Sequence, residues 1–156
     1  TNKSTWSVLT LSLKRYGNWF NYTGPSIKLM QPNFIDHVTL IVKDIRRTEG
    51  FYSKFLGNPI IQNEGLVVYK TGEVHLYFKL SPTGLKDILY DKDQIGMNHI
   101  GFGVRTIEEL KEFEQFLTQA GITHSEFKTG KLGNQYFWFD DPDGIRLEIY
   151  HRPAEE

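Results

Sequence analysis

Hydrophobic and polar residues alternate in two stretches of the chain that repeat one another. Residues 35–42 (IDHVTLIV) and 97–104 (MNHIGFGV) each carry a histidine at the third position and then alternate in polarity, as a half-buried β-strand does. His37 and His99 lie 62 positions apart (99 − 37). The same offset relates three further apolar pairs: Ile45 and Ile107, Phe51 and Phe113, Phe55 and Leu117. The pattern predicts an internal duplication.

The first copy predicts the element order β-α-β-β-β. After the strand at 35–42, Asp44 is a suitable N-cap for a helix that runs to about Leu56 and stops at Gly57. Three short strands separated by turn-like residues are then expected, at 59–62, 66–70 and 74–80.

The second copy predicts the same order. A strand at 99–104 precedes a helix that begins after Thr106, with Glu109 completing a capping box, and ends at Ala120 before Gly121. Three further strands are expected, at 122–127, 135–139 and 145–150. A tight turn, Asp-Pro-Asp-Gly, precedes the last of them.

These elements indicate an α+β domain built from two modules. We assign residues 34–152 to a single domain and residues 1–33 to an N-terminal extension that has no counterpart in the repeat. The extension could form an added strand or helix, or contact a partner. The parts of the domain are the first module at 34–80, a polar linker at 81–96 and the second module at 97–152.

The alternation along each strand separates an apolar face from a face that carries potential metal ligands. The apolar residues of each strand are expected to pack on the helix of the module. The opposite face carries four candidate metal ligands: His37, His75, His99 and Glu148. Gly101 and Gly103 beside His99 leave room for a ligand. A lone strand histidine is usually a hydrogen-bonded or solvated residue, so the joint pattern carries the prediction of a metal site.

The chemical types of the candidate ligands limit which metal ions and reactions such a site could support. Imidazole and carboxylate groups suit Zn, Ni, Fe, Mn or Co. Two histidines and one carboxylate form the facial arrangement of non-haem Fe(II) sites, whereas a fourth protein ligand favours Lewis-acid action on two substrate oxygens. Tyr136 and Trp138 fall on the same face and either stack on a substrate or fill a core rich in aromatic residues.

Composition excludes several classes of protein. The 156 residues carry a net charge of −1 with no basic block, which argues against nucleic-acid binding. The chain has no Cys, so disulfides and thiolate ligands are absent, as suits a reducing compartment. No apolar run is long enough to span a membrane or to form a signal core. We therefore expect a cytoplasmic protein that binds a small molecule.

Several motifs within residues 34–152 resemble the vicinal oxygen chelate superfamily, which includes glyoxalase I, extradiol dioxygenases, methylmalonyl-CoA epimerase and fosfomycin-resistance proteins. They are HVTLIV at 37–42, FYSKFLG at 51–57, NHI at 98–100 and DPDGIRLE at 141–148. The resemblance implies tandem βαβββ modules whose sheets form a curved open barrel around a metal cleft. It also implies metal ligands at His37, His99 and Glu148, with a fourth position at His75.

Individual positions separate the members of that superfamily. His75 stands where glyoxalase-like members have Glu or Gln, which leaves Glu148 as the only carboxylate ligand and the candidate proton acceptor. Trp138 stands where extradiol enzymes typically carry Tyr, and the stretch 129–131 lacks their His. Thr39 stands where the fosfomycin group has a phosphonate-contacting Thr.

Three functional hypotheses follow. The first is a glyoxalase-like, divalent-metal-dependent lyase or isomerase that acts on a small substrate with neighbouring oxygens. The second is an Fe(II) extradiol-type dioxygenase. The third is a non-catalytic protein that binds an antibiotic or metabolite, with Tyr136 and Trp138 holding it. With one pair of modules per chain, we also expect a homodimer.

Overall fold

The computed structural model describes residues 8–15, 18–25, 31–84 and 88–154. The chain divides into two compact units, Thr1–Phe34 and Ile35–Glu156. Each unit is described by itself below.

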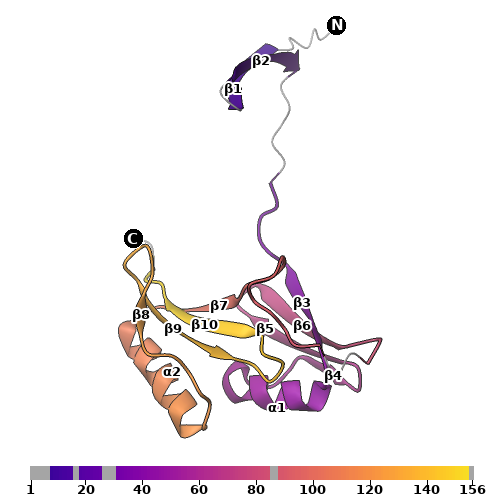
Figure 1. The fold of residues 1–156 in the computed structure, drawn as a ribbon, viewed down its shortest axis with the longest axis vertical. Helices are drawn as coiled ribbons and strands as arrows, with labels where there is room; N and C mark the ends of the chain where they lie inside the picture. Colours follow the sequence, from indigo (N-terminus) through magenta and orange to yellow (C-terminus); the bar gives the residue numbers. More distant parts are fainter. Residues whose placement is uncertain (1–7, 16–17, 26–30, 85–87, 155–156) are drawn as a thin grey trace, which may run out of the picture. The chain divides into compact units, whose positions relative to one another are not determined.

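The N-terminal unit contains a two-stranded antiparallel ladder (Figure 1). Strand β1 (Val8–Arg15) pairs with β2 (Asn18–Pro25), so that Val8 lies opposite Pro25 and Arg15 opposite Asn18. Residues 8–15 and 18–25 of the extension therefore form strands, and a contact with a partner stays a prediction.

The second unit contains two four-stranded sheets of identical topology (Figure 1). The first sheet comprises β3 (His37–Val42), β4 (Ile61–Asn63), β5 (Leu66–Thr71) and β6 (Val74–Leu80). Across this sheet the strands lie in the order β3-β6-β5-β4. The second sheet comprises β7 (Ile100–Val104), β8 (Lys128–Thr129), β9 (Gln135–Asp140) and β10 (Arg146–His151). Its strands lie in the order β7-β10-β9-β8. The first and last strands of each module pair in parallel and the remaining pairs are antiparallel. The predicted duplication is confirmed.

The two helices begin and end where the capping residues indicate. The Asp44 side chain accepts a hydrogen bond from the Arg47 backbone N–H at the start of α1 (Ile45–Leu56), and Gly57 follows with φ +78°. Thr106 and Glu109 form the predicted capping box at the start of α2 (Ile107–Gln119). The described residues form the two helices α1 and α2, and neither is long and apolar enough to cross a bilayer.

The strand predicted at 122–127 is wrong. This segment makes only a single bridge, from His124 to Phe139, and the short strand β8 comes after it. The Ser125 carbonyl accepts from the His124 ring, while the Ser125 hydroxyl accepts from the Trp138 N–H. Because side chains occupy the groups that a ladder would use, regular pairing does not extend along the segment.

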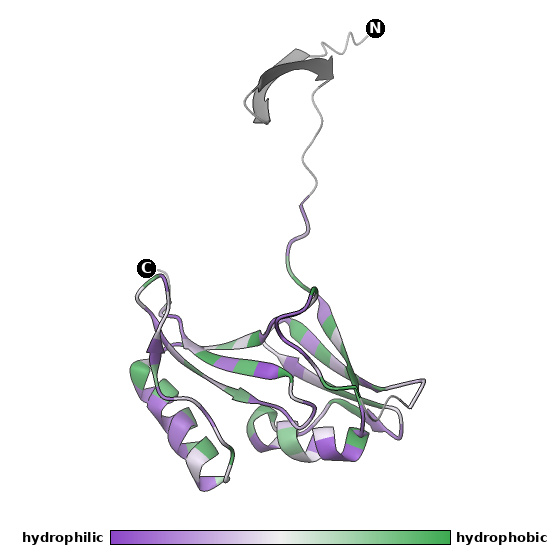
Figure 2. Ribbon diagram, viewed as in Figure 1, coloured by the Kyte–Doolittle hydropathy of each residue, from purple (hydrophilic) through white to green (hydrophobic). Residues whose placement is uncertain are grey.

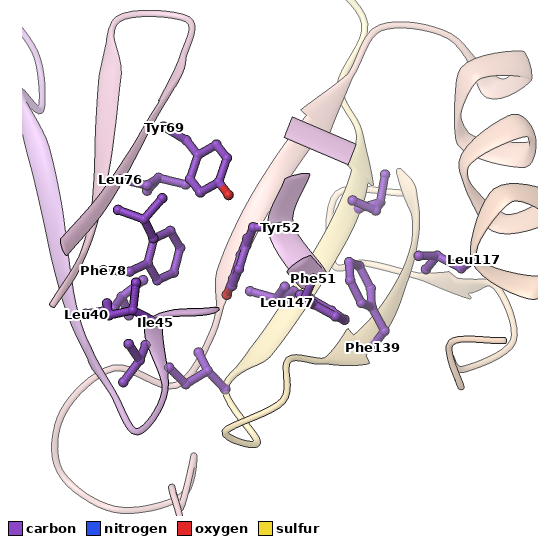
Figure 3. Close-up of a cluster of buried hydrophobic side chains, with 14 of the residues drawn as sticks. Leu40, Ile45, Phe51, Tyr52, Tyr69, Leu76, Phe78, Leu117, Phe139 and Leu147 are labelled. Carbon is purple, nitrogen blue, oxygen red and sulfur yellow. The ribbon is translucent and has the colours of Figure 1, made fainter. Parts of the chain in front are cut away.

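A single aromatic core connects the two modules. Both helices cover the same side of the two sheets (Figure 1), and apolar residues alternate with polar ones along the central strands (Figure 2). Tyr52 of α1 packs against Phe78 of the first sheet, with ring centroids 4.2 Å apart, and belongs to the same buried cluster as Leu147 of the second (Figure 3). All three side chains are fully buried. The sheets are curved and open rather than closed into a barrel, which leaves the face opposite the helices uncovered by them.

Candidate metal centre

The four predicted ligands lie in two pairs on the face opposite the helices. His37 and His75 are directly opposite one another in the parallel pairing of β3 with β6. His99 immediately precedes β7, and its Nε2 lies 3.5 Å from Oε2 of Glu148 on β10. The Glu148 side chain is only 15% exposed, whereas that of His99 is 41% exposed. His37 and His75 are therefore neighbours on the first sheet, and His99 and Glu148 are neighbours on the second.

The residue before each repeated histidine fixes the orientation of its ring. Asp36 Oδ2 lies 2.7 Å from Nδ1 of His37, and Asn98 Oδ1 lies 2.8 Å from Nδ1 of His99. Because these oxygens accept hydrogen bonds, each Nδ1 donates, and in the neutral form of each ring Nε2 is then the nitrogen with the lone pair. Such partners are typical of metal-binding histidines. Our sequence analysis missed both residues, although each occupies the same place in the repeat.

One chain does not bring the two pairs together. Among the residues that the structure describes, no three His, Asp or Glu side chains lie close enough to hold a metal ion. The pairs lie on separate sheets, and the strands beside them, β3 and β7, are both edge strands. Each sheet therefore carries two of the four candidate donors.

The predicted substrate-binding residues share this face. Thr39 is exposed on β3, two residues after His37. Trp138 lies opposite Glu148 in the sheet, and the Arg146 guanidinium lies 3.7 Å above the centroid of its indole ring. Tyr136 stacks on Tyr150 with ring centroids 5.5 Å apart. One face of each predicted aromatic residue is therefore already covered by a side chain of the protein.

A hollow of about 480 Å³ adjoins the His99–Glu148 pair. A Cβ atom placed on Gly101 or Gly103 would meet no heavy atom within 4 Å. The two glycines therefore leave open space along β7, as the sequence predicts. The residues that line the hollow are His99, Gly101, Phe102, Gly103, Arg105, Glu148, Tyr150 and Arg152.

A buried turn ties the start of β10 to the first module. The Tyr52 hydroxyl donates to Asp141, and the Lys43 backbone N–H and the Arg47 side chain donate to Asp143. Burial raises the pKa of Asp141 to about 6 and also raises the pKa of Tyr52. Because β10 carries Glu148, this turn helps to position the carboxylate relative to His99.

Comparison with known families and proteins agrees with this architecture. The family model for the Glyoxalase/Bleomycin resistance protein/Dioxygenase superfamily matches residues 34–149. A putative glyoxalase from Bacillus halodurans, of known crystal structure, superposes with a TM-score of 0.69 at 21% identity and covers 77% of this chain and 96% of that one.

Two curated proteins are similar in sequence. Glutathione transferase FosA from Serratia marcescens is 29% identical over an alignment of 117 residues, and the match covers 74% of this chain and 79% of that protein. Uncharacterized protein YwkD from Bacillus subtilis is 26% identical over an alignment of 130 residues, and the match covers 76% of this chain and 96% of that protein. In each case the similarity extends over most of both chains.

Proposed function

Because the chain belongs to the glyoxalase/bleomycin resistance protein/dioxygenase superfamily, we propose that it is a divalent-metal-dependent lyase or isomerase of the glyoxalase-like type. Its substrate would be a small molecule with neighbouring oxygens. The observation that carries this proposal is the His99–Glu148 pair, in which Asn98 holds the ring so that Nε2 faces the carboxylate. Asp36 holds His37 in the same way on the other sheet.

The donor set fits a divalent metal. Three imidazoles and one carboxylate suit Zn, Ni, Fe, Mn or Co, and the ring orientations leave Nε2 of His37 and His99 available. His37, His75, His99 and Glu148 would hold the ion. When bound, such an ion supplies Lewis-acid polarisation of substrate oxygens.

We further propose that a second copy of the chain completes the site. Each chain presents His37 with His75 on one sheet and His99 with Glu148 on the other, beside the edge strands β3 and β7. Edge strands carry unpaired backbone groups and can pair with another chain. A homodimer in which β3 of one copy approaches β7 of the other would assemble all four ligands.

The remaining residues take roles around this centre. Glu148 would be both a ligand and the acceptor of a substrate proton, because it is the only carboxylate among the four. Thr39, Tyr136 and Trp138 would contact the substrate from the same face. A cytoplasmic location stays a prediction.

Metal content tests the proposal. We expect plasma mass spectrometry of the untagged protein to find close to one divalent metal per chain and the His99→Ala variant to lose it. Loss in His75→Ala as well would establish a fourth ligand, while retention would leave a three-residue site. A wild-type protein that neither carries nor binds metal on titration would contradict the proposal and favour a binding protein on this fold.

Substrate assays then separate the two enzyme classes. The relative named Glutathione transferase FosA makes glutathione the first thiol to test together with dicarbonyl compounds. The second candidate, an Fe(II) dioxygenase, is favoured by the two-histidine, one-carboxylate set that remains if His75 is no ligand. Redox-active iron with oxygen uptake on catechols would select that candidate.

A further inference from the structure

Two arginines leave neighbouring strands at the same end of the second sheet. Arg105 follows β7 and Arg152 follows β10, and these strands are parallel (Figure 1). The Arg152 backbone N–H donates to the Val104 carbonyl at 2.8 Å, which continues the pairing one step beyond β10. The two arginines therefore lie side by side.

Both arginines share a face with the His99–Glu148 pair and line the same hollow. Along β7 this face carries His99, Gly101, Gly103 and Arg105, and along β10 it carries Glu148, Tyr150 and Arg152. At the usual rise of a strand, the backbone of Arg152 lies about 13 Å from that of Glu148. Metal donors thus lie at one end of the hollow and two cationic groups at the other.

Along β7, the floor between the two ends carries no side chain. Gly101 and Gly103 are exposed and have open space where a side chain would begin. A substrate several atoms long could lie along β7 between the metal donors and the arginines.

Two positive charges at neighbouring positions of the sheet favour an anion beside them. Like charges that are neighbours across a pair of strands repel one another. Neither guanidinium forms an ion pair with a carboxylate of the described residues. The nearby Glu109 carboxylate accepts instead from the backbone N–H groups of Arg105 and Thr106.

Uncharged groups hold the two guanidiniums. Arg105 Nη1 donates to the Arg152 carbonyl oxygen at 3.2 Å, and the Arg152 guanidinium lies 5.0 Å from the centroid of the Tyr150 ring. Within the described part of the chain, no acceptor occupies the other guanidinium N–H groups, and their planar fork matches the oxygens of a carboxylate or a phosphate.

We infer that Arg105 and Arg152 form an anion subsite. The substrate of the proposed enzyme then carries a carboxylate or phosphate group at the end opposite its chelating oxygens. This inference rests on the proposed function, since it uses the metal end of the hollow to orient the substrate.

Two matched pairs of probes test the subsite on Zn²⁺-loaded protein by titration calorimetry. 2-Hydroxyglutarate and 2-hydroxypentanoate share a chelating end and a five-carbon chain, but only the first has a second carboxylate. 3-Phosphoglycerate and glycerate provide the same contrast for a phosphate. We expect the charged member of at least one pair to bind about tenfold more tightly, and the pair with the larger ratio identifies the anion.

Variants assign that advantage to the arginines. Arg105→Gln and Arg152→Gln should each reduce the ratio to about twofold while the zinc content is unchanged. Arg46→Gln provides the matched control, because Arg46 is exposed on α1 and does not line the hollow. Ratios near one for both probe pairs, or a ratio preserved when both arginines are replaced, would overturn the inference.

Failure of the proposed function has a different signature. If the wild-type protein binds no Zn²⁺, the metal proposal fails, and titration with inorganic phosphate then tests the subsite alone. Phosphate binding that the double arginine variant weakens at least about threefold would support the subsite, and unchanged or absent phosphate binding would overturn it.

Discussion

The side chain before each repeated histidine occupies one ring nitrogen, Nδ1, and leaves Nε2 as the candidate donor atom. Asn98 accepts from His99 Nδ1, and its own amide donates to the Lys92 carbonyl at 2.7 Å, which holds the amide in place. Asp36 makes the corresponding contact with His37. The repeat therefore duplicates both a donor atom and the group that orients it.

Removing this partner should weaken metal binding without removing a ligand. We expect Asn98→Ala to lower Zn²⁺ affinity by about 10–100-fold, because the His99 ring loses its hydrogen-bond acceptor. Competition against a chromophoric chelator measures the change. Asn98→Asp keeps the acceptor oxygen and loses only the bond to Lys92, so it should retain most of the affinity. Equal affinity of Asn98→Ala and wild type would contradict this role.

The buried turn before β10 should make stability depend on pH. The pKa of Asp141 is about 6 in the folded protein and near its ordinary value of 3.8 when unfolded, so between these values the folded state binds the extra proton. Raising the pH through this window therefore lowers the free energy of unfolding, by up to about 3 kcal/mol. Asp141→Asn stays neutral and should lack this decline. Urea titrations from pH 4 to 7 compare the two, and parallel profiles would refute the assignment.

Among the elements, β7 combines low side-chain volume with a position beside the candidate site. Gly101 and Gly103 weaken the strand, since glycine loses more conformational freedom on folding than other residues. The open space above them makes ligand access a physical reason for this composition. Adding a side chain at one of these glycines should therefore raise the stability of the protein and weaken its binding of a ligand in the hollow.

Gly103→Val tests this opposition. We expect its thermal stability to equal or exceed that of wild type, because valine favours strands and no neighbour lies within 4 Å of the new Cβ. Binding of 2-hydroxyglutarate to the zinc-loaded variant should fall about tenfold or more, because the side chain fills the hollow. Gly50→Ala, within α1, is the control and should raise stability by about 1 kcal/mol without affecting binding. Unchanged affinity in Gly103→Val would place the ligand elsewhere.

The elements predicted most accurately from sequence are those with local signals. The caps at Asp44 and Thr106 determine where both helices begin, and period-two alternation predicts β6 at its observed bounds. The segment at 122–127 fails because the side chains of His124 and Ser125 compete for backbone groups, which alternation does not report. Alternation also predicts that the candidate ligands share one face of their sheets. It does not determine whether the edges of the two sheets meet within one chain or between two chains.

At the scale of the whole molecule, the edge strands β3 and β7 lead us to expect that two chains form one site. β3 and β7 end their sheets beside His37 and His99, and the two donor pairs do not meet among the described residues. A symmetric dimer with β3 of each copy against β7 of the other would form two equivalent sites, each taking one pair from each chain. Light scattering of the wild-type protein should accordingly give the mass of a dimer.

Mixing two inactive variants distinguishes a shared site from one made within a chain. His37→Ala and His99→Ala should each lose bound metal, because every site then lacks a ligand. After subunit exchange about half of the dimers are mixed, and one of the two sites in each mixed dimer has all four ligands, so about a quarter of the wild-type metal content should return. Mixing His99→Ala with Glu148→Ala should restore none, since both changes affect the same pair. If metal content stays at zero in the first mixture although mass spectrometry detects mixed dimers, the four ligands belong to one chain and the edges β3 and β7 have another role.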